Sequence, residues 1–270
     1  MDAILGPLFS PAAWPTFVCV SARLVGMMLI APIWSMTAVP RATRAAIAVL
    51  LAAMLLPGAP RAVLPDEAAL VPLVILSDLL VGLAIGLTAA VLFQGVALAG
   101  EVVSLQMGLS LGQALAPMIE VQTEGVGQVQ GLFALTIYLS LGGHLMLLEG
   151  VAGSLVAIPP GTLGNFASGG ALAASLGNGV FLTAARVGAP VIAALFLTNI
   201  ALALLNRAVP QLNTMMVSFP VTVAVGLLMV GLALPVLGNA TAEWTGRLGS
   251  LTASVIEALT PAPAPAPAPR

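Results

Sequence analysis

Charged and redox-active side chains are scarce in this sequence. Its 270 residues include ten acids, eight arginines, no lysine, one histidine and one cysteine, and charged residues make up only 7% of the total. A soluble domain carries about 25% charged residues, so these few cannot cover a water-exposed globule. The single Cys19 excludes an intrachain disulfide and a multi-cysteine metal site. The net charge of −2 gives no basic surface for nucleic acid.

The same scarcity removes several catalytic motifs. Without lysine there is no GxxxxGK[ST] phosphate loop, one histidine cannot form HExxH, and one cysteine cannot form CxxC. His144 and Ser154 lie ten residues apart, which is too weak a pairing to indicate a serine protease. We therefore expect no enzymatic activity, no metal and no cofactor.

What the chain has in abundance is apolar sequence, at 60% hydrophobic residues. A bilayer core of about 30 Å is crossed by roughly 20 apolar residues in a helix. Six apolar segments satisfy or approach this length: Ala12–Trp34, Ala45–Leu56, Ala68–Ala99, Val126–Ile158, Ala171–Leu205 and Met215–Leu237. The longest must tilt, extend beyond the bilayer or break into two helices. The pattern predicts an all-α membrane protein whose helical membrane domain covers residues 1–239.

Glycine and proline recur inside these apolar runs. The 21 prolines free backbone carbonyls within helices and predict kinks. Among the 28 glycines, the pairs Gly82/Gly86 and Gly108/Gly112 let helix backbones approach closely. Such contacts can form within one bundle or with another chain, and the sequence does not distinguish the two.

The C-terminal part differs in kind from the rest. Residues 240–260 mix polar and apolar side chains at helical spacing, which predicts an amphipathic helix that lies at an interface or docks. Residues 261–270, PAPAPAPAPR, lack an N–H at every second position and predict an extended tail.

Six charges stand within or beside the apolar runs: Arg23, Asp78, Glu101, Glu149, Arg186 and Arg207. A charge at a helix centre costs about 2.5–3.5 kcal/mol on insertion scales. These residues therefore form a polar path or subunit contacts, or they simply sit at helix ends. The second interpretation suits Arg207 and Glu149 but suits Arg23 and Asp78 poorly. A proton relay through a single carboxylate also stays open.

Three blocks of sequence point to a known family. They are Arg23 with Ala31-Pro32-Ile33 and Val39-Pro40-Arg41, then Gly100–Ser110 (GEVVSLQMGLS), and finally Asn206–Leu212 (NRAVPQL) followed by Ser218-Phe219-Pro220. In this order and spacing they resemble the FliR family of type III export-apparatus proteins. The resemblance covers nearly the whole chain. The Ala116-Pro117 pair departs from it, because an acid often precedes that proline in the family.

The resemblance implies a structural pore-forming subunit of a flagellar export gate in the bacterial inner membrane, within the flagellar basal body. Such subunits assemble with FliP-like and FliQ-like proteins as kinked helices and helical hairpins, beside FlhB-like and FlhA-like export proteins. Unfolded flagellar proteins would be the substrates. The alternative is a secondary transporter of a small solute, built from the glycine- and proline-broken helices and Asp78.

Two sets of site residues follow from the resemblance. The segment 109–128 corresponds to a loop that plugs the pore, or else to an ordinary connection between helices. Its sealing residues are Leu109, Leu111, Leu115, Pro117, Met118 and Ile119. The expected intersubunit polar contacts are Arg23, Asp78, Glu101, Gln106, Asn206, Arg207 and Gln211.

Overall fold

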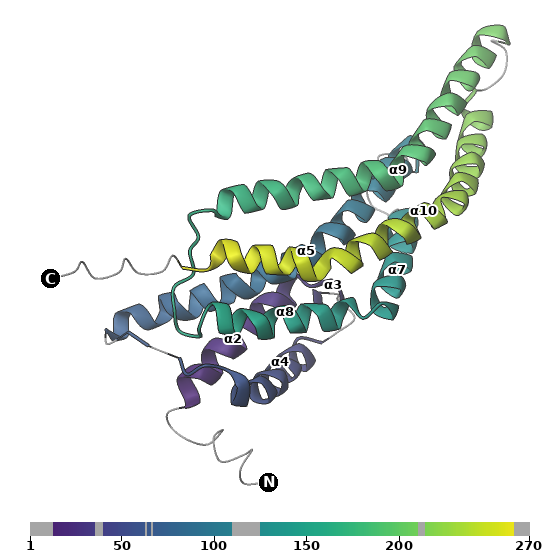
Figure 1. Cartoon of the computed structure of the whole chain (residues 1–270). Helices are drawn as coiled ribbons and strands as arrows, with labels where there is room; N and C mark the ends of the chain where they lie inside the picture. The colour runs from purple at the N-terminus through teal and green to yellow at the C-terminus, as the bar shows by residue number, and fades with distance from the viewer. Residues whose placement is uncertain are drawn as a thin grey trace. The chain divides into compact units, whose positions relative to one another are not determined.

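The computed structural model describes residues 13–35, 40–62, 64–65, 67–109, 125–209 and 214–261. These residues form helices and loops without any strand (Figure 1). The helices are α2 (Trp14–Ile30), α3 (Pro32–Ser35), α4 (Arg41–Leu55), α5 (Val71–Gln106), α7 (Gly125–Ser140), α8 (Gly143–Ala157), α9 (Gly169–Ala208) and α10 (Thr214–Leu259), with short 3-10 helices η3 (Leu56–Gly58) and η4 (Ala68–Leu70). The predicted all-α fold is confirmed.

Four helical stretches of the described chain are long and apolar enough to cross a membrane. They are α4 with η3, α5, α9 and most of α10, and the pair α7–α8 adds a fifth if it forms one broken span. The predicted segment Val126–Ile158 is thus two helices. The break follows from Gly142, whose φ of 73° lies in the left-handed region that glycine adopts without strain.

A glycine also ends α5. Gly108 has a φ of 77°, and the N–H groups of Gly108 and Leu109 donate to the carbonyl oxygens of Leu105 and Ser104, each at 3.1 Å. This is the Schellman arrangement, which satisfies carbonyls that have no partner within the helix. The end of α5 is therefore encoded locally, at the glycine of the GEVVSLQMGLS block.

Helices α9 and α10 continue through their prolines. Pro190 lies inside α9, and Pro220 and Pro235 lie inside α10, although each lacks the N–H that a helix interior requires. The predicted amphipathic helix 240–260 is the second half of α10, so the expected boundary at residue 239 falls inside one helix.

The chain divides into two compact units. Unit 1 comprises Met1–Ala90, Gly142–Leu176 and Gly246–Arg270. Its described core is built from buried side chains of several helices, among them Leu24 and Met27 of α2, Ala52 of α4, Ile85 of α5, Val151 of α8 and Leu248 of α10. The part of α10 from Gly246 onward thus contributes buried apolar side chains to the core of unit 1.

Unit 2 comprises Val91–Leu141 and Gly177–Thr245. Parts of α5, α7, α9 and α10 pack in two clusters. One contains Val96, Ala134, Val187 and Leu237, among others, and the second contains Met107, Val126, Leu195 and Ala233, among others. Gly100 of α5 and Gly127 of α7 meet so closely that a Cβ at residue 100 would overlap the Gly127 backbone. Small residues therefore set the spacing of these helices.

Candidate functional site

A buried ion pair lies in unit 1. The Nε of Arg23 on α2 donates to Oδ1 of Asp78 on α5 at 3.0 Å, and Nη2 of the same guanidinium donates to the same oxygen. Both side chains are 0% exposed. Two charges out of water are tolerated only when they are paired and their remaining hydrogen-bonding groups are satisfied.

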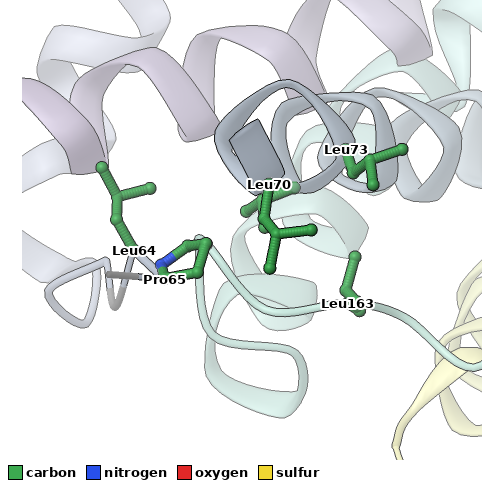
Figure 2. A pocket seen from close by; sticks show the side chains of 7 residues that line it. Leu64, Pro65, Leu70, Leu73 and Leu163 are labelled. Atoms are coloured by element: carbon green, nitrogen blue, oxygen red, sulfur yellow. The ribbon is translucent and has the colours of Figure 1, made fainter. Parts of the chain in front are cut away.

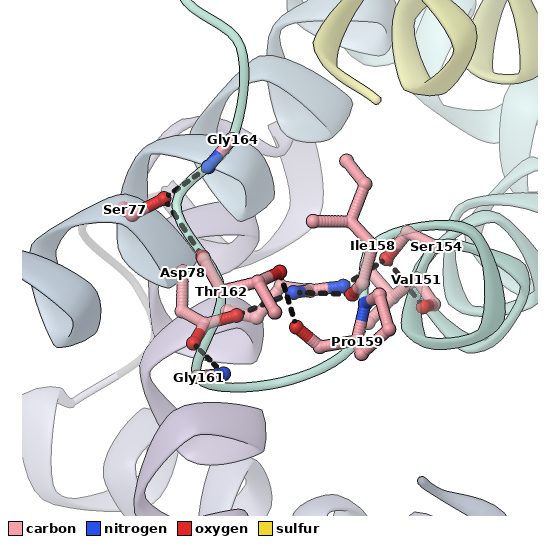
Figure 3. Close-up of polar contacts among 10 residues, drawn as sticks. Ser77, Asp78, Val151, Ser154, Ile158, Pro159, Gly161, Thr162 and Gly164 are labelled. Atoms are coloured by element: carbon pink, nitrogen blue, oxygen red, sulfur yellow. Dashed lines mark hydrogen bonds and ion pairs between the residues drawn. The ribbon is translucent and has the colours of Figure 1, made fainter. Parts of the chain in front are cut away.

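The rest of the network provides that satisfaction (Figure 3). Nη1 of Arg23 donates to Oγ of Ser154 at 3.0 Å, and Nη2 donates to the carbonyl oxygen of Ile158 at 3.0 Å. Oδ2 of Asp78 accepts the N–H of Gly161 at 3.1 Å. The ion pair therefore joins α2, α5, the end of α8 and the loop that follows α8. We call these five residues the clasp.

Close helix packing allows Arg23 to reach Asp78. A Cβ added at Gly26 of α2 would overlap the carbonyl oxygen of Leu79, and one at Gly82 of α5 would overlap that of Arg23. At Gly86 the added atom would lie 2.6 Å from the carbonyl oxygen of Met27. The Gly82/Gly86 pair thus serves packing within the chain, which is one of the two alternatives that the sequence left open.

The loop after α8 is fixed to α5 at a second point. The N–H of Gly164 donates to Oγ of Ser77 at 2.9 Å, and that hydroxyl donates to the carbonyl oxygen of Thr162 at 3.3 Å. Gly161 has a φ of 85°, a conformation that side-chain-bearing residues rarely adopt. Adjacent Ser77 and Asp78 therefore hold this loop together.

The clasp connects helices and leaves no accessible carboxylate. Asp78 was the residue on which the transporter alternative rested, yet it has no exposed surface and both its oxygens are engaged. Arg23 and Asp78 were also expected to contact other subunits. Each is instead satisfied within the chain.

The other predicted polar contacts do not come together at one site. Glu101 on α5 and Arg207 in the last turn of α9 are exposed, while Gln106 and Asn206 are half-buried. The Oε1 atom of Gln106 is buried without a hydrogen-bond partner among the described residues. Gln211 lies outside the described residues. These residues remain candidates for contacts beyond the chain.

Most of the predicted plug also lies outside the described residues. Leu109 packs against the second cluster of unit 2, and residues 125–128 form the first turn of α7 rather than part of a loop. The remaining predicted sealing residues, Leu111, Leu115, Pro117, Met118 and Ile119, belong to the segment that the structure does not describe.

Sequence reasoning missed a second ion pair, in unit 2. Nη1 of Arg186 on α9 donates to Oε2 of Glu243 on α10 at 2.9 Å, and the two side chains are 62% and 43% exposed. In the sequence, Arg186 is an isolated charge in an apolar run, and Glu243 falls within the predicted C-terminal helix 240–260. The only feature of the sequence that could have indicated this pair is the opposite charge of the two residues. Nothing in the sequence indicates that Ser154 would bind Arg23 or that Gly161 would bind Asp78.

A family model and several known proteins match this chain over most of its length, and these matches agree with one another. Residues 14–248 match the family described as bacterial export proteins, family 1. The chain is similar to the flagellar biosynthetic protein FliR of Escherichia coli (strain K12), with 27% identity over 248 residues that cover 91% of this chain and 92% of that protein. It is 31% identical to the FliR of Bacillus subtilis (strain 168) over 230 residues, which cover 83% and 88% of the two chains.

Proposed function

Because the chain belongs to the bacterial export proteins, family 1, we propose that it is the structural pore-forming subunit of a flagellar type III export gate. At a coarser level, it is a multi-pass membrane subunit of the flagellar export apparatus, since the FliR of Escherichia coli (strain K12) matches 91% of its length and several of its described helices are long and apolar enough to cross a membrane. The proposal adds that the gate lies in the inner membrane and passes unfolded flagellar proteins. FliP-like and FliQ-like subunits complete it, and FlhB-like and FlhA-like proteins adjoin it.

One observation carries the proposal: the apolar surface of the α9–α10 hairpin in unit 2. Large apolar side chains of both helices are exposed, at Phe196, Leu197, Ile200 and Leu204 of α9 and at Leu227, Leu228, Leu232 and Val236 of α10. Many large apolar side chains exposed together on neighbouring helices mark a surface that lipid or another protein covers. A single copy of the chain leaves it uncovered.

Charges bracket this surface. Arg186, paired with Glu243, stands at one end, and Arg207 stands at the other. The intervening residues 187–206 span about 30 Å as a helix at 1.5 Å per residue, which equals the thickness of a bilayer core. The exposed ion pair needs water or polar protein around it, because charges in hydrocarbon are expensive. The hairpin is therefore suited to a membrane-embedded assembly with a wet or protein-covered edge.

The partner subunits are proposed from the family resemblance. We assign the hairpin face to FliP-like and FliQ-like subunits, and Arg207 with Asn206 to polar contacts at the edge of that interface. Gln106, whose Oε1 is buried without a partner among the described residues, is a further candidate for such a contact. We assign no catalytic role to the chain.

Co-purification of the full chain with FliP-like and FliQ-like subunits tests the proposal. Leu197→Asn and Arg207→Ala should each reduce the recovered partners severalfold, because each alters the proposed interface. The matched controls are Leu50→Asn and Arg41→Ala on α4, since Leu50 and Leu197 are 64% and 66% exposed and Arg41 is exposed like Arg207. Full recovery of partners with both hairpin variants would refute this assignment.

A further inference from the structure

An apolar groove lies in unit 1, beside the clasp (Figure 2). Its volume is about 230 Å³. Leu64 and Pro65 form one wall, Leu70 and Leu73 at the start of α5 form another, and Gly161 and Leu163 of the loop after α8 complete it. No charged or polar side chain lines it among the described residues.

The backbone around the groove offers few donors to a polar ligand. The N–H of Gly161 is bound by Asp78 and that of Gly164 by Ser77, while Pro65 has no N–H. A stable water needs two to four polar partners, and apolar cavities of about 150 Å³ stay dry and take up apolar molecules instead. The chemistry of the walls therefore selects a hydrocarbon ligand.

The groove continues onto an exposed helix face. Leu73, Leu76 and Leu80 of α5 are exposed at a spacing of three and four residues, so they form one stripe that begins in the groove. Helix α5 is long and apolar enough to cross a membrane. Hydrocarbon in the groove could thus extend along α5 without leaving an apolar surface.

The segment that forms one wall of the groove has charged residues near it in the sequence. Arg61 and Glu67 stand on either side of Leu64 and Pro65 in the sequence, and both are exposed. An apolar groove whose wall is flanked in the sequence by charges of both signs suits an amphiphile with a long hydrocarbon chain and a charged headgroup. A purely apolar solute would gain nothing from those charges.

We propose that the groove binds one acyl chain of a membrane phospholipid, with the headgroup near Arg61 and Glu67. This proposal does not depend on the proposed function of the chain as a pore-forming subunit. Gly161 forms part of the groove and also donates to Asp78, so the lipid and the clasp hold the same loop. A bound chain would therefore act as a structural lipid that fixes the loop after α8 against α5.

Photo-crosslinking in membranes that contain the full chain and its partners tests this proposal. The probe is a phospholipid with a diazirine on its acyl chain, and the labelled peptides are mapped by mass spectrometry. We expect labelling within residues 64–74 and 159–164. Leu163→Trp should reduce it about tenfold, because the larger side chain occupies the volume that the acyl chain needs.

The matched control is Leu50→Trp on α4, since Leu50 and Leu163 are 64% and 60% exposed and Leu50 lies outside the groove. It should leave the labelling unchanged. The amount of each variant in the membrane, and its recovery with partner subunits, show whether it folds, and Leu73→Trp provides a second groove-filling variant. Absence of label from the wild-type groove, or equal label in well-folded groove variants, would overturn the proposal.

Discussion

The guanidinium of Arg23 and the carboxylate of Asp78 bind each other in the interior of unit 1, although 55 residues separate them in the sequence. Neither has any exposed surface. Because Arg23 also reaches Ser154 and Ile158, one side chain links α2 to α5 and to the end of α8. Two charges that are isolated in apolar sequence thus form a buried ion pair that holds the helices of unit 1 together.

Removing one member of this pair should be costly. In Asp78→Asn the Arg23 charge stays buried without its counter-ion, and breaking a buried pair in this way costs about 3–5 kcal/mol. We expect a lower unfolding temperature for the purified chain and less chain in the membrane. Thermal unfolding in detergent and quantitative immunoblotting measure the two effects.

The double variant Arg23→Met/Asp78→Asn is the control for charge. It removes both charges, so it should be more stable than Asp78→Asn alone, and the two substitutions should be non-additive. If the double variant lost the sum of the two single effects, the ion pair would not be the source of the stability.

The sequence predicted the kind of element better than it predicted the partners of each element. Apolar length alone gave the helices around Ala68–Ala99 and Ala171–Leu205, because a run of such length has few other solutions in a membrane. The break at Gly142 inside Val126–Ile158 was foreseen only as one of three options. Its place depends on a single backbone conformation, which apolar length does not report.

The clasp was harder to predict from sequence. The cost of burying Arg23 and Asp78 showed that they needed partners, but it did not show that they would meet each other. Their pairing depends on which faces of α2 and α5 touch, and that is set by glycines such as Gly26 and Gly82. Gly161 contributes only its backbone N–H, which donates to Asp78. Because every residue except proline has such a group, the sequence could not single it out.

Those glycines give a second prediction. Gly82→Ala should destabilise the chain by about 1–3 kcal/mol, since the new methyl group forces α2 and α5 apart where the backbone of Arg23 cannot yield. Thermal unfolding of the purified chain measures the loss. Separation of the helices should also lengthen the hydrogen bonds between the Arg23 guanidinium and the Asp78 carboxylate.

Gly153→Ala on α8 is the control, because a Cβ there meets no atom within 4 Å. In a helix interior alanine is favoured over glycine by about 0.5–1 kcal/mol, so this variant should be as stable as the wild type or slightly more stable. Equal behaviour of the two alanine variants would contradict the close crossing of α2 and α5.

The last prediction concerns the segment that the resemblance assigns to the plug. It begins after the glycine cap of α5 at Gly108 and ends where α7 begins at Gly125, so folded helices hold both of its ends. Leu111, Leu115, Met118 and Ile119 are apolar side chains that can seal a lumen by excluding water, and methionine adapts well to irregular gaps. Deleting Leu111–Met118 should therefore raise ion leakage through a reconstituted gate, measured as conductance in a planar bilayer.

A deletion also shortens the connection, so a second variant replaces the four apolar residues by serine at constant length. Raised leakage in both variants would assign the seal to the apolar side chains, and raised leakage in the deletion alone would assign it to the length of the connection. Unchanged conductance in both, with the gate fully assembled, would leave the segment as an ordinary link between α5 and α7.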